Sequence, residues 1–222
     1  MSKKIKYVTF GVQWLHNRIN LNRLHTLSMR PRFHRLESVL DRRVEVKNPQ
    51  CICIGHHVSI QPYVWLCAMI NDLPNINVFD PSITIGDYST IGRFCQITIS
   101  NKLLIEDHVL ITEDVLITDT IHGYADINTP IIKQPLVSRG PIIIGRGSWI
   151  GNGARIVGKV TIGKNSVVGS NAYVDKDVPD YCIVAGIPAS IVKRFDLQKH
   201  KWISVDEPLL PLEAKHKNIF CR

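Results

Sequence analysis

Aliphatic residues recur at every sixth position along the second half of this 222-residue chain. Four places after each of them stands a residue that is small or β-branched. The aliphatic positions are Ile144, Ile150, Ile156, Ile162, Val168 and Val174, and the positions four places later are Ser148, Ala154, Val160, Ser166, Ala172 and Val178. A period of six fits neither an α-helix, with about 3.6 residues per turn, nor a plain β-strand, with a period of two.

This period predicts a three-sided coil in which each hexapeptide forms a short strand and a corner. Three hexapeptides close one coil of about 18 residues, and the aliphatic side chains point inward and stack on their equivalents in neighbouring coils. Strands of successive coils then pair in parallel and satisfy one another's backbone groups. The predicted fold class is therefore all-β, a parallel β-helix.

The same period extends upstream, although it is interrupted. Its aliphatic positions there are Ile54, Ile60, Leu66, Ile85, Ile91, Ile97, Ile105, Ile111 and Ile117. The register slips by two residues between Ile97 and Ile105, and two longer breaks cover residues 67–84 and 118–143. Long excursions from a regular scaffold often carry function, so we expect these two loops to line a site.

Composition narrows the class of protein. Hydrophobic residues make up 45% of the chain, and no apolar run approaches the ~20 residues needed to span a bilayer. No small-residue cleavage site follows the basic start, so a signal peptide is not expected and we predict a cytoplasmic location for the protein. The chain has six cysteines. Cys51 and Cys53 lack a second pair at zinc spacing and Cys95 fills a core position, so free thiols are expected.

The net charge of +8 is concentrated before the coils, in residues 1–47. Two interpretations stay open: a solvated cap over the first coil, or attraction to an anionic glycan, a lipid carrier or the membrane surface. No aromatic ladder accompanies the scattered basic residues, so nucleic acid is not an expected partner. We expect a basic N-terminal cap over 1–43, the coil over 44–195 and a strap over 196–222.

Residues 44–195 resemble the hexapeptide-repeat acyltransferases, and the stretch 141–195 is most similar to the maltose, galactoside and polysaccharide O-acetyltransferases. The resemblance is carried by the segments IIIGRGSWIG, VDKDVP and GIPASIVKRF. It implies a left-handed coil, whereas crossover connections are otherwise nearly always right-handed. It also implies a short helix or strap that closes the C-terminal end. Such enzymes use acetyl-CoA, need no metal and form homotrimers with one site per interface.

The resemblance places a catalytic histidine in the 118–143 excursion, whose single histidine is His122. An imidazole can accept the proton of a sugar hydroxyl near neutral pH. The oxygen then attacks the thioester carbon of acetyl-CoA, backbone N–H groups stabilise the oxyanion, and no protein nucleophile is required. Asp119 could orient the ring or simply cap a turn, and Asp126 is a further acid of this loop.

The resemblance also assigns two groups of binding residues. The donor positions are Trp149, Asn152, Ser170, Asp175, Lys176, Ser190, Lys193 and Arg194. Gln96, Asn101 and Tyr124 are the acceptor candidates, and Trp65 and Tyr88 are further aromatic residues that could stack on a sugar. Ser190 stands where the family often has a basic residue, and Arg194 could replace that charge on the nucleotide phosphates.

Three functions are compatible with this pattern. The first is transfer of acetyl from acetyl-CoA to a sugar hydroxyl, in the biosynthesis of a surface polysaccharide, O-antigen or capsule. The second is acylation of a nucleotide-sugar amine or a xenobiotic on the same scaffold. The third belongs to another class, a metal-dependent hydratase or a non-catalytic scaffold, although the 118–143 loop offers one imidazole where a zinc site needs several.

Overall fold

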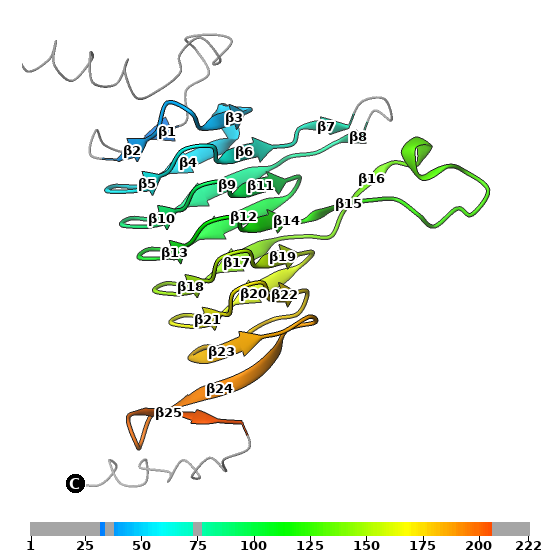
Figure 1. Ribbon diagram of the computed structural model, residues 1–222. Helices are drawn as coiled ribbons and strands as arrows, with labels where there is room; N and C mark the ends of the chain where they lie inside the picture. Colours follow the sequence, from blue (N-terminus) through cyan, green and yellow to red (C-terminus); the bar gives the residue numbers. More distant parts are fainter. Residues whose placement is uncertain (1–31, 34–37, 73–76, 206–222) are drawn as a thin grey trace, which may run out of the picture.

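The computed structural model describes residues 32–33, 38–72 and 77–205. Three sheets of mainly parallel strands wrap around one core and rise along the molecule as a three-sided coil (Figure 1). We call the faces sheets A, B and C, in the order in which the chain visits them within one coil.

Sheet A consists of β1 (Arg32–Phe33), β4 (Ile52–Ile54), β9 (Ser82–Ile85), β12 (Lys102–Ile105), β17 (Ile142–Ile144) and β20 (Val160–Ile162). Sheet B consists of β2 (Val39–Leu40), β5 (Ser59–Ile60), β10 (Thr90–Ile91), β13 (Leu110–Ile111), β18 (Trp149–Ile150), β21 (Val167–Val168), β23 (Cys182–Ala185), β24 (Ser190–Asp196) and β25 (Lys201–Ser204). Sheet C consists of β3 (Glu45–Lys47), β6 (Trp65–Ala68), β11 (Gln96–Ile99), β14 (Leu116–Thr118), β19 (Arg155–Val157) and β22 (Tyr173–Val174).

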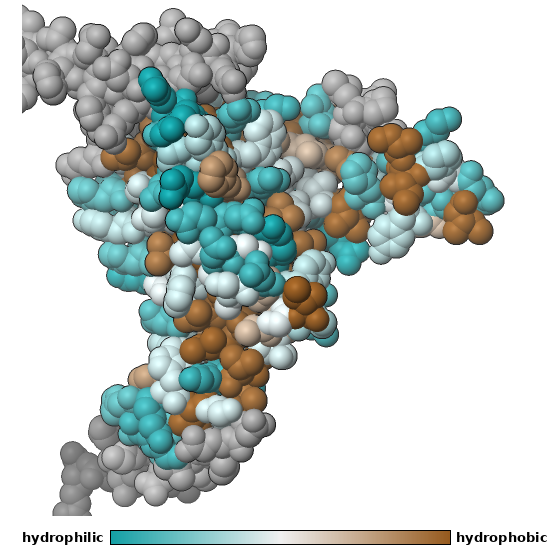
Figure 2. All heavy atoms as spheres, viewed as in Figure 1, coloured by the Kyte–Doolittle hydropathy of each residue, from teal (hydrophilic) through white to brown (hydrophobic). Residues whose placement is uncertain are grey.

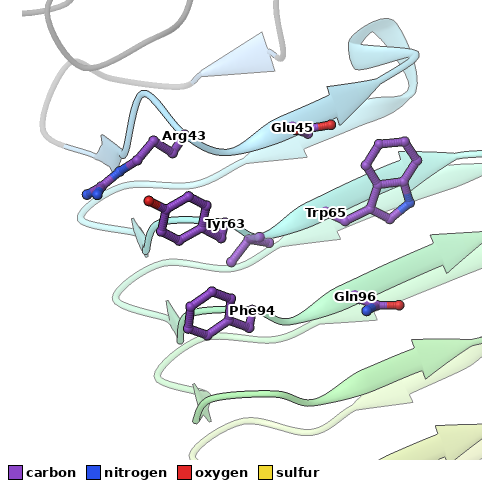
Figure 3. A pocket seen from close by; sticks show the side chains of 7 residues that line it. Arg43, Glu45, Tyr63, Trp65, Phe94 and Gln96 are labelled. Carbon is purple, nitrogen blue, oxygen red and sulfur yellow. The ribbon is translucent and has the colours of Figure 1, made fainter.

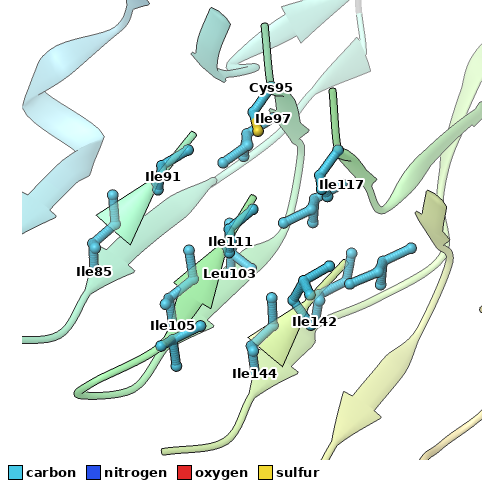
Figure 4. Close-up of a cluster of buried hydrophobic side chains, with 14 of the residues drawn as sticks. Ile85, Ile91, Cys95, Ile97, Leu103, Ile105, Ile111, Ile117, Ile142 and Ile144 are labelled. Atoms are coloured by element: carbon cyan, nitrogen blue, oxygen red, sulfur yellow. The ribbon is translucent and has the colours of Figure 1, made fainter. Parts of the chain in front are cut away.

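The core follows the sixfold period. Every aliphatic position of the predicted repeat is at most 2% exposed, and every small or β-branched position of residues 144–179 is at most 4% exposed. Figure 4 shows these side chains stacked between the three faces. Buried serines at the small positions satisfy their hydroxyls across coils, since Ser148 Oγ donates to Gly163 O at 2.7 Å and Ser166 Oγ to Pro179 O at 2.8 Å.

The two-residue slip lengthens one coil without opening it. Ile85 of β9 pairs with Ile105 of β12, 20 residues later, whereas the regular coil from Ile144 to Ile162 takes 18 residues. Ile99 and Leu103 on either side of the extra turn are both fully buried. The turn between β11 and β12 therefore stays packed against the core.

Two antiparallel hairpins leave the coil at the corner between sheets C and A (Figure 1). The first pairs β7 (Asn71–Asp72) with β8 (Asn77–Val78). The second pairs β15 (Thr120–His122) with β16 (Leu136–Ser138), and the 3₁₀ turn η2 (Ile131–Lys133) lies near its tip. We call residues 119–141 the arm. They fall within the 118–143 break of the sequence pattern.

The C-terminal end is closed by extended chain. β24 pairs antiparallel with β23, and β25 pairs antiparallel with β24. Where the sequence left a short helix or an extended strap open, the structure has the strands β24 and β25, so the short helix is wrong; residues 206–222 of the expected 196–222 strap lie outside the described residues. β24 satisfies the open edge of the last coil strand, which a helix over the same residues could not do. Phe195 and Trp202 pack edge to face on this hairpin, with ring centroids 5.4 Å apart.

The N-terminal basic segment falls largely on residues 1–31 and 34–37, which lie outside the described residues. β2 already pairs with β5 as a coil strand before residue 44. The helices of the described ranges are two 3₁₀ turns, η1 (Pro49–Cys51) and η2, and neither could cross a membrane. The five cysteines in these ranges are free thiols, as predicted.

Candidate active site

His122 lies on β15 near the base of the arm, and its side chain is exposed. Within the described residues the imidazole has no hydrogen-bond or ion-pair partner. The neighbouring Gly123 fixes its position, because Gly123 N donates to Pro135 O at 2.9 Å. A Cβ on Gly123 would lie 2.5 Å from that oxygen, so only glycine allows the two strands of the arm to approach so closely.

Asp119 is fully buried at the base of the arm. Its Oδ1 accepts from Ser100 N at 2.8 Å and from Thr120 Oγ1 at 2.8 Å, and its Oδ2 accepts from Asn101 N at 2.7 Å. Asp119 lies at the bend between β14 and β15 with its side chain fully buried, whereas the side chain of His122, three residues later, is exposed. This geometry favours the capping role over the orienting role for Asp119.

Asp126 also has local partners. Its carboxylate accepts from Asn128 N at 2.9 Å and from Thr129 Oγ1 at 2.6 Å. The hydrogen bond from Thr129, followed by that from Asn128, lowers the pKa of Asp126. The Gln134 amide holds the same loop by donating to Asp126 O and Thr129 O, each at 2.8 Å. Neither acid of the arm hydrogen-bonds to His122.

The arm presents apolar side chains to its surroundings, as Figure 2 shows along the projecting segment. Ile127 is 94% exposed and Ile132 is 72% exposed, and the acceptor candidate Tyr124 is exposed as well. Exposed apolar side chains grouped on a projection are typical of a contact surface.

Two of the donor candidates, Trp149 and Lys193, stand at the ends of a row of four residues across the outer face of sheet B. Trp149 pairs with Val167, Val167 with Ile183, and Ile183 with Lys193. Three strand spacings of about 4.8 Å separate the ends of the row by about 14 Å. Trp149 is half-exposed and Lys193 is exposed. We call Trp149, Val167, Ile183 and Lys193 the donor row.

Arg194 does not join this row. It is opposite Cys182 on β23, and consecutive residues of a strand point to opposite faces. Burial raises the pKa of the Cys182 thiol, and a hydrogen bond with Arg194 partly offsets this effect. Lys193 and Arg194 therefore face different surroundings, although they are neighbours in sequence.

The remaining donor candidates divide between two corners. Asn152 and Ser170 occupy equivalent places at the corner between sheets B and C, where Asn171 N donates to Asn152 O at 2.8 Å. Asp175 and Lys176 follow β22, at the corner between sheets C and A from which the arm leaves. Ser190 begins β24 opposite Ala185. The structure thus brings Asn152 and Ser170 near the donor row and separates Asp175 and Lys176 from it.

The arm and the donor row lie on opposite sides of the coil. The arm leaves the corner between sheets C and A, and Trp149 projects from sheet B, which is the face opposite that corner. The hydrophobic core separates them within one chain. One chain therefore cannot bring His122 against its own donor row.

Two of the three acceptor candidates, Gln96 and Asn101, lie on or beside sheet C, whereas Tyr124 lies on the arm. Gln96 is exposed on the outer face of β11, opposite Trp65 of β6. Asn101 is exposed on the turn that Asp119 holds. Tyr88 lies elsewhere, at the corner between sheets A and B, where its ring stacks between those of His57 and His108.

A groove of about 460 Å³ opens beside Gln96. Its lining side chains are Arg43, Glu45, Tyr63, Trp65, Phe94 and Gln96 (Figure 3). We call it the aromatic groove. Sequence reasoning missed Tyr63 and Phe94. The signal was present, since both are aromatic residues three places after an inward aliphatic residue, where exposed corners are expected.

Comparison with known proteins agrees with this architecture. Residues 141–176 match the family described as bacterial transferase hexapeptide (six repeats). The chain is similar to a probable acetyltransferase of Mycobacterium tuberculosis, with 35% identity over 128 residues that make up 58% of this chain and 42% of that protein. It is similar to the galactoside O-acetyltransferase of Escherichia coli, with 43% identity over 61 residues, 27% of this chain and 30% of that protein. The chain thus spans less than half the length of these relatives.

Among solved structures, the chain is similar to AntD, an N-acyltransferase from Bacillus cereus in complex with dTDP and 3-hydroxybutyryl-CoA. The TM-score is 0.59 at 20% identity, and the likeness covers 78% of this chain and 86% of that chain. At this identity the likeness shows the fold alone. The predicted left-handed parallel β-helix is confirmed, and residues 141–176 carry the hexapeptide repeat of bacterial transferases.

Proposed function

We propose that this protein transfers the acetyl group of acetyl-CoA to a hydroxyl group of a sugar. The relatives named above as acetyltransferases support the transfer of acetyl. The observation that carries the proposal is the donor row, an exposed strip that begins with the Trp149 indole and ends with the Lys193 ammonium. Such a strip suits a long thioester arm whose far end carries phosphates, because a cation there can pair with phosphate oxygens.

The histidine of the arm supplies the base. His122 accepts the proton of the sugar hydroxyl, and the oxygen attacks the carbonyl carbon of the thioester. The resulting oxyanion needs N–H donors. The N–H of Asn152 has no partner within the described residues, unlike those of Gly151 and Gly153, and we propose it as one donor. Collapse breaks the C–S bond, and the imidazolium returns its proton to the departing thiolate. The products are an acetyl ester and the free thiol of CoA.

Two copies are needed for this reaction, since one chain keeps His122 and its donor row apart. The arm projects from the coil and carries exposed Ile127 and Ile132, which suits contact with a second copy. We propose a homotrimer in which the arm of each chain reaches the donor row of the next, because such a head-to-tail contact closes on itself in a ring. Each interface then holds one complete site.

The reaction is proposed to belong to surface-polysaccharide biosynthesis in the cytoplasm. Five free cysteines in the described part of the chain suit a reducing compartment. The two half-buried thiols Cys51 and Cys53 also make a control necessary in any assay that detects released thiol.

The test combines release of CoA with the chemistry of the product. Purified protein is mixed with acetyl-CoA and with methyl β-galactoside, a nucleotide-linked amino sugar or chloramphenicol. We expect CoA release with the sugar hydroxyl and a product whose added acetyl is removed by mild base, as an ester is. An acetyl that resists mild base would instead establish N-acylation, and no CoA release with any acceptor would refute acetyl transfer.

A further inference from the structure

The aromatic groove lies on the first coils, away from the donor row, and its walls are parallel rings. The rings of Tyr63 and Phe94 stack with centroids 5.3 Å apart and an interplanar angle of 2°. Tyr63 is 52% exposed and Phe94 is 53% exposed, so part of each ring remains open to solvent, although Arg43 lies over the Tyr63 ring. Trp65 adds a third aromatic surface on the adjoining strand (Figure 3).

The fold itself does not require aromatic residues at these two corners. Tyr63 and Phe94 have φ angles of 62° and 63°, in the left-handed region that favours Gly, Asn and Asp. In later coils the same corner holds Asp114, Gly153 and Asn171. The first coils therefore place large exposed rings where small residues would suit the backbone better, and this arrangement needs a reason other than stability.

Polar groups of both signs surround the rings. Arg43 lies over the Tyr63 ring at 5.0 Å, and its Nε donates to Asp41 Oδ1 at 2.9 Å. Glu45 and Gln96 line the opposite side of the groove. The carboxylates of Asp41 and Glu45 offset Arg43, so the groove does not have the strong positive charge that a nucleic-acid backbone requires.

A sugar ring fits this combination of surfaces. Its faces carry C–H groups that pack against a flat aromatic ring, and its edge carries hydroxyls that need donors and acceptors. A partner protein or a lipid chain would favour a more continuous apolar surface than one bordered by Arg43, Glu45 and Gln96. The volume of about 460 Å³ is within the range of small-molecule sites.

We propose that the aromatic groove binds a saccharide ring of an oligosaccharide acceptor, at a distance from the hydroxyl that is acetylated. This inference rests on the proposed function, which it deepens by making the acceptor an oligosaccharide. Gln96 is opposite Leu116 on β14, and His122 follows Leu116 by six residues of mostly extended chain. Strand geometry therefore places His122 at most about 25 Å from the groove, within reach of a chain of several sugars.

Binding is tested in the full chain without acetyl-CoA, by calorimetric titration. The probes are maltohexaose, β1,4-galactotetraose, β1,4-mannohexaose and tetragalacturonic acid, with uridine diphosphate as a ligand of another class. Phe94→Asn and Tyr63→Asn remove the rings but suit the left-handed backbone. Tyr88→Asn is the matched control, since Tyr88 has a φ of 58° and 54% exposure at the corner between sheets A and B.

We expect at least one saccharide to bind, with an affinity that falls about tenfold or more in Phe94→Asn and Tyr63→Asn and changes less than about twofold in Tyr88→Asn. The proposal is overturned if no saccharide binds at about 10 mM. Equal losses in Tyr88→Asn, or binding of uridine diphosphate in place of the saccharides, would also overturn it. This titration does not depend on acetyl transfer. If the protein releases CoA in the transfer assay but binds no saccharide in the titration, the groove proposal is refuted and the proposed function is not.

Discussion

The backbone N–H of Asn101 donates to Asp119 Oδ2 at 2.7 Å across 18 residues of sequence. The same carboxylate accepts the N–H of Ser100, so it ties the turn after β11 to the base of the arm in the next coil. Thr120, the first residue of β15, donates its hydroxyl to the other oxygen at 2.8 Å. The direction in which the arm leaves the coil is therefore set by one buried carboxylate.

Replacing Asp119 should destabilise the fold. In Asp119→Asn one carboxylate oxygen becomes an NH₂ group that cannot accept, so the N–H of either Ser100 or Asn101 loses its partner, and leaving such a donor unsatisfied costs about 1–3 kcal/mol. Thermal unfolding measures this loss. Asp114→Asn is the control, since Asp114 is an exposed acid paired with Arg155 at 3.4 Å and should change stability by less than about 0.5 kcal/mol. Equal effects of the two substitutions would exclude the role given to Asp119.

Gly123→Ala should disturb the arm and leave the coil intact. The added Cβ would lie 2.5 Å from Pro135 O, so β15 and β16 must separate and His122 must move. A displacement of about 1 Å at a catalytic base can lower kcat about a hundredfold. Ser138→Ala on β16 is the control, because the buried Ser138 hydroxyl has no hydrogen-bond partner within the described residues. Steady-state kinetics and unfolding of both variants check this, and unchanged kcat in Gly123→Ala would contradict it.

The two adjacent basic residues of β24 should differ in their effect on acetyl-CoA. Lys193 ends the donor row, whereas Arg194 points to the opposite face beside Cys182. Lys193→Ala should raise the KM for acetyl-CoA about tenfold with little change in kcat, and Arg194→Ala should change it less than about twofold. Initial rates at varied acetyl-CoA measure both. A larger effect of Arg194→Ala would move the phosphate site to the other face of the strand.

The Cys95 thiol should resist alkylation in the native protein. Burial raises the pKa of Cys95 to about 11. A raised pKa keeps the group protonated as the thiol at pH 8, and the thiolate is the reactive form. Iodoacetamide at pH 8 followed by peptide mass analysis should therefore find Cys53 modified in native protein and Cys95 modified only after unfolding. Native modification of Cys95 at the rate of Cys53 would show that its core position is wrong.

The inward-facing positions of the fold could be predicted from the sequence, because a position buried in the core requires an aliphatic or a small residue. Ile150 and Ala154 recur six residues from their equivalents, and both are fully buried. The interruption of the period also located the arm, since the inward aliphatic positions stop after Ile117 and resume at Ile144. The extended form of the C-terminal strap was harder to predict. Residues Ser190–Asp196 form a strand because they pair with β23, and this pairing cannot be read from their own sequence pattern.

The contacts of the outward-facing side chains could not be predicted in the same way, because these contacts depend on which positions become neighbours across coils. Asp119 was a candidate to orient His122, but its partners at Ser100 and Asn101 come from another coil. Tyr63 and Phe94 are 31 residues apart in sequence because an excursion lies between them, and they stack because they occupy the same corner of neighbouring coils. Lys193 and Arg194 were grouped by adjacency, and strand geometry separates them.

We propose that the arm of one copy completes the site on the donor row of another copy. A His122→Ala chain and a Trp149→Ala/Lys193→Ala chain, each with a different tag, are co-expressed and purified through both tags in turn. Each oligomer alone should be nearly inactive, because every interface lacks one partner.

The decisive measurement is the rate of acetyl-CoA turnover by the mixed oligomer, at acetyl-CoA concentrations below the KM for acetyl-CoA. In a mixed trimer one chain meets a neighbour that carries the missing half, so about one site in three should be restored. Activity near one third of the wild-type value is the predicted result. Activity no higher than the mean of the two parent oligomers would contradict a site shared between copies.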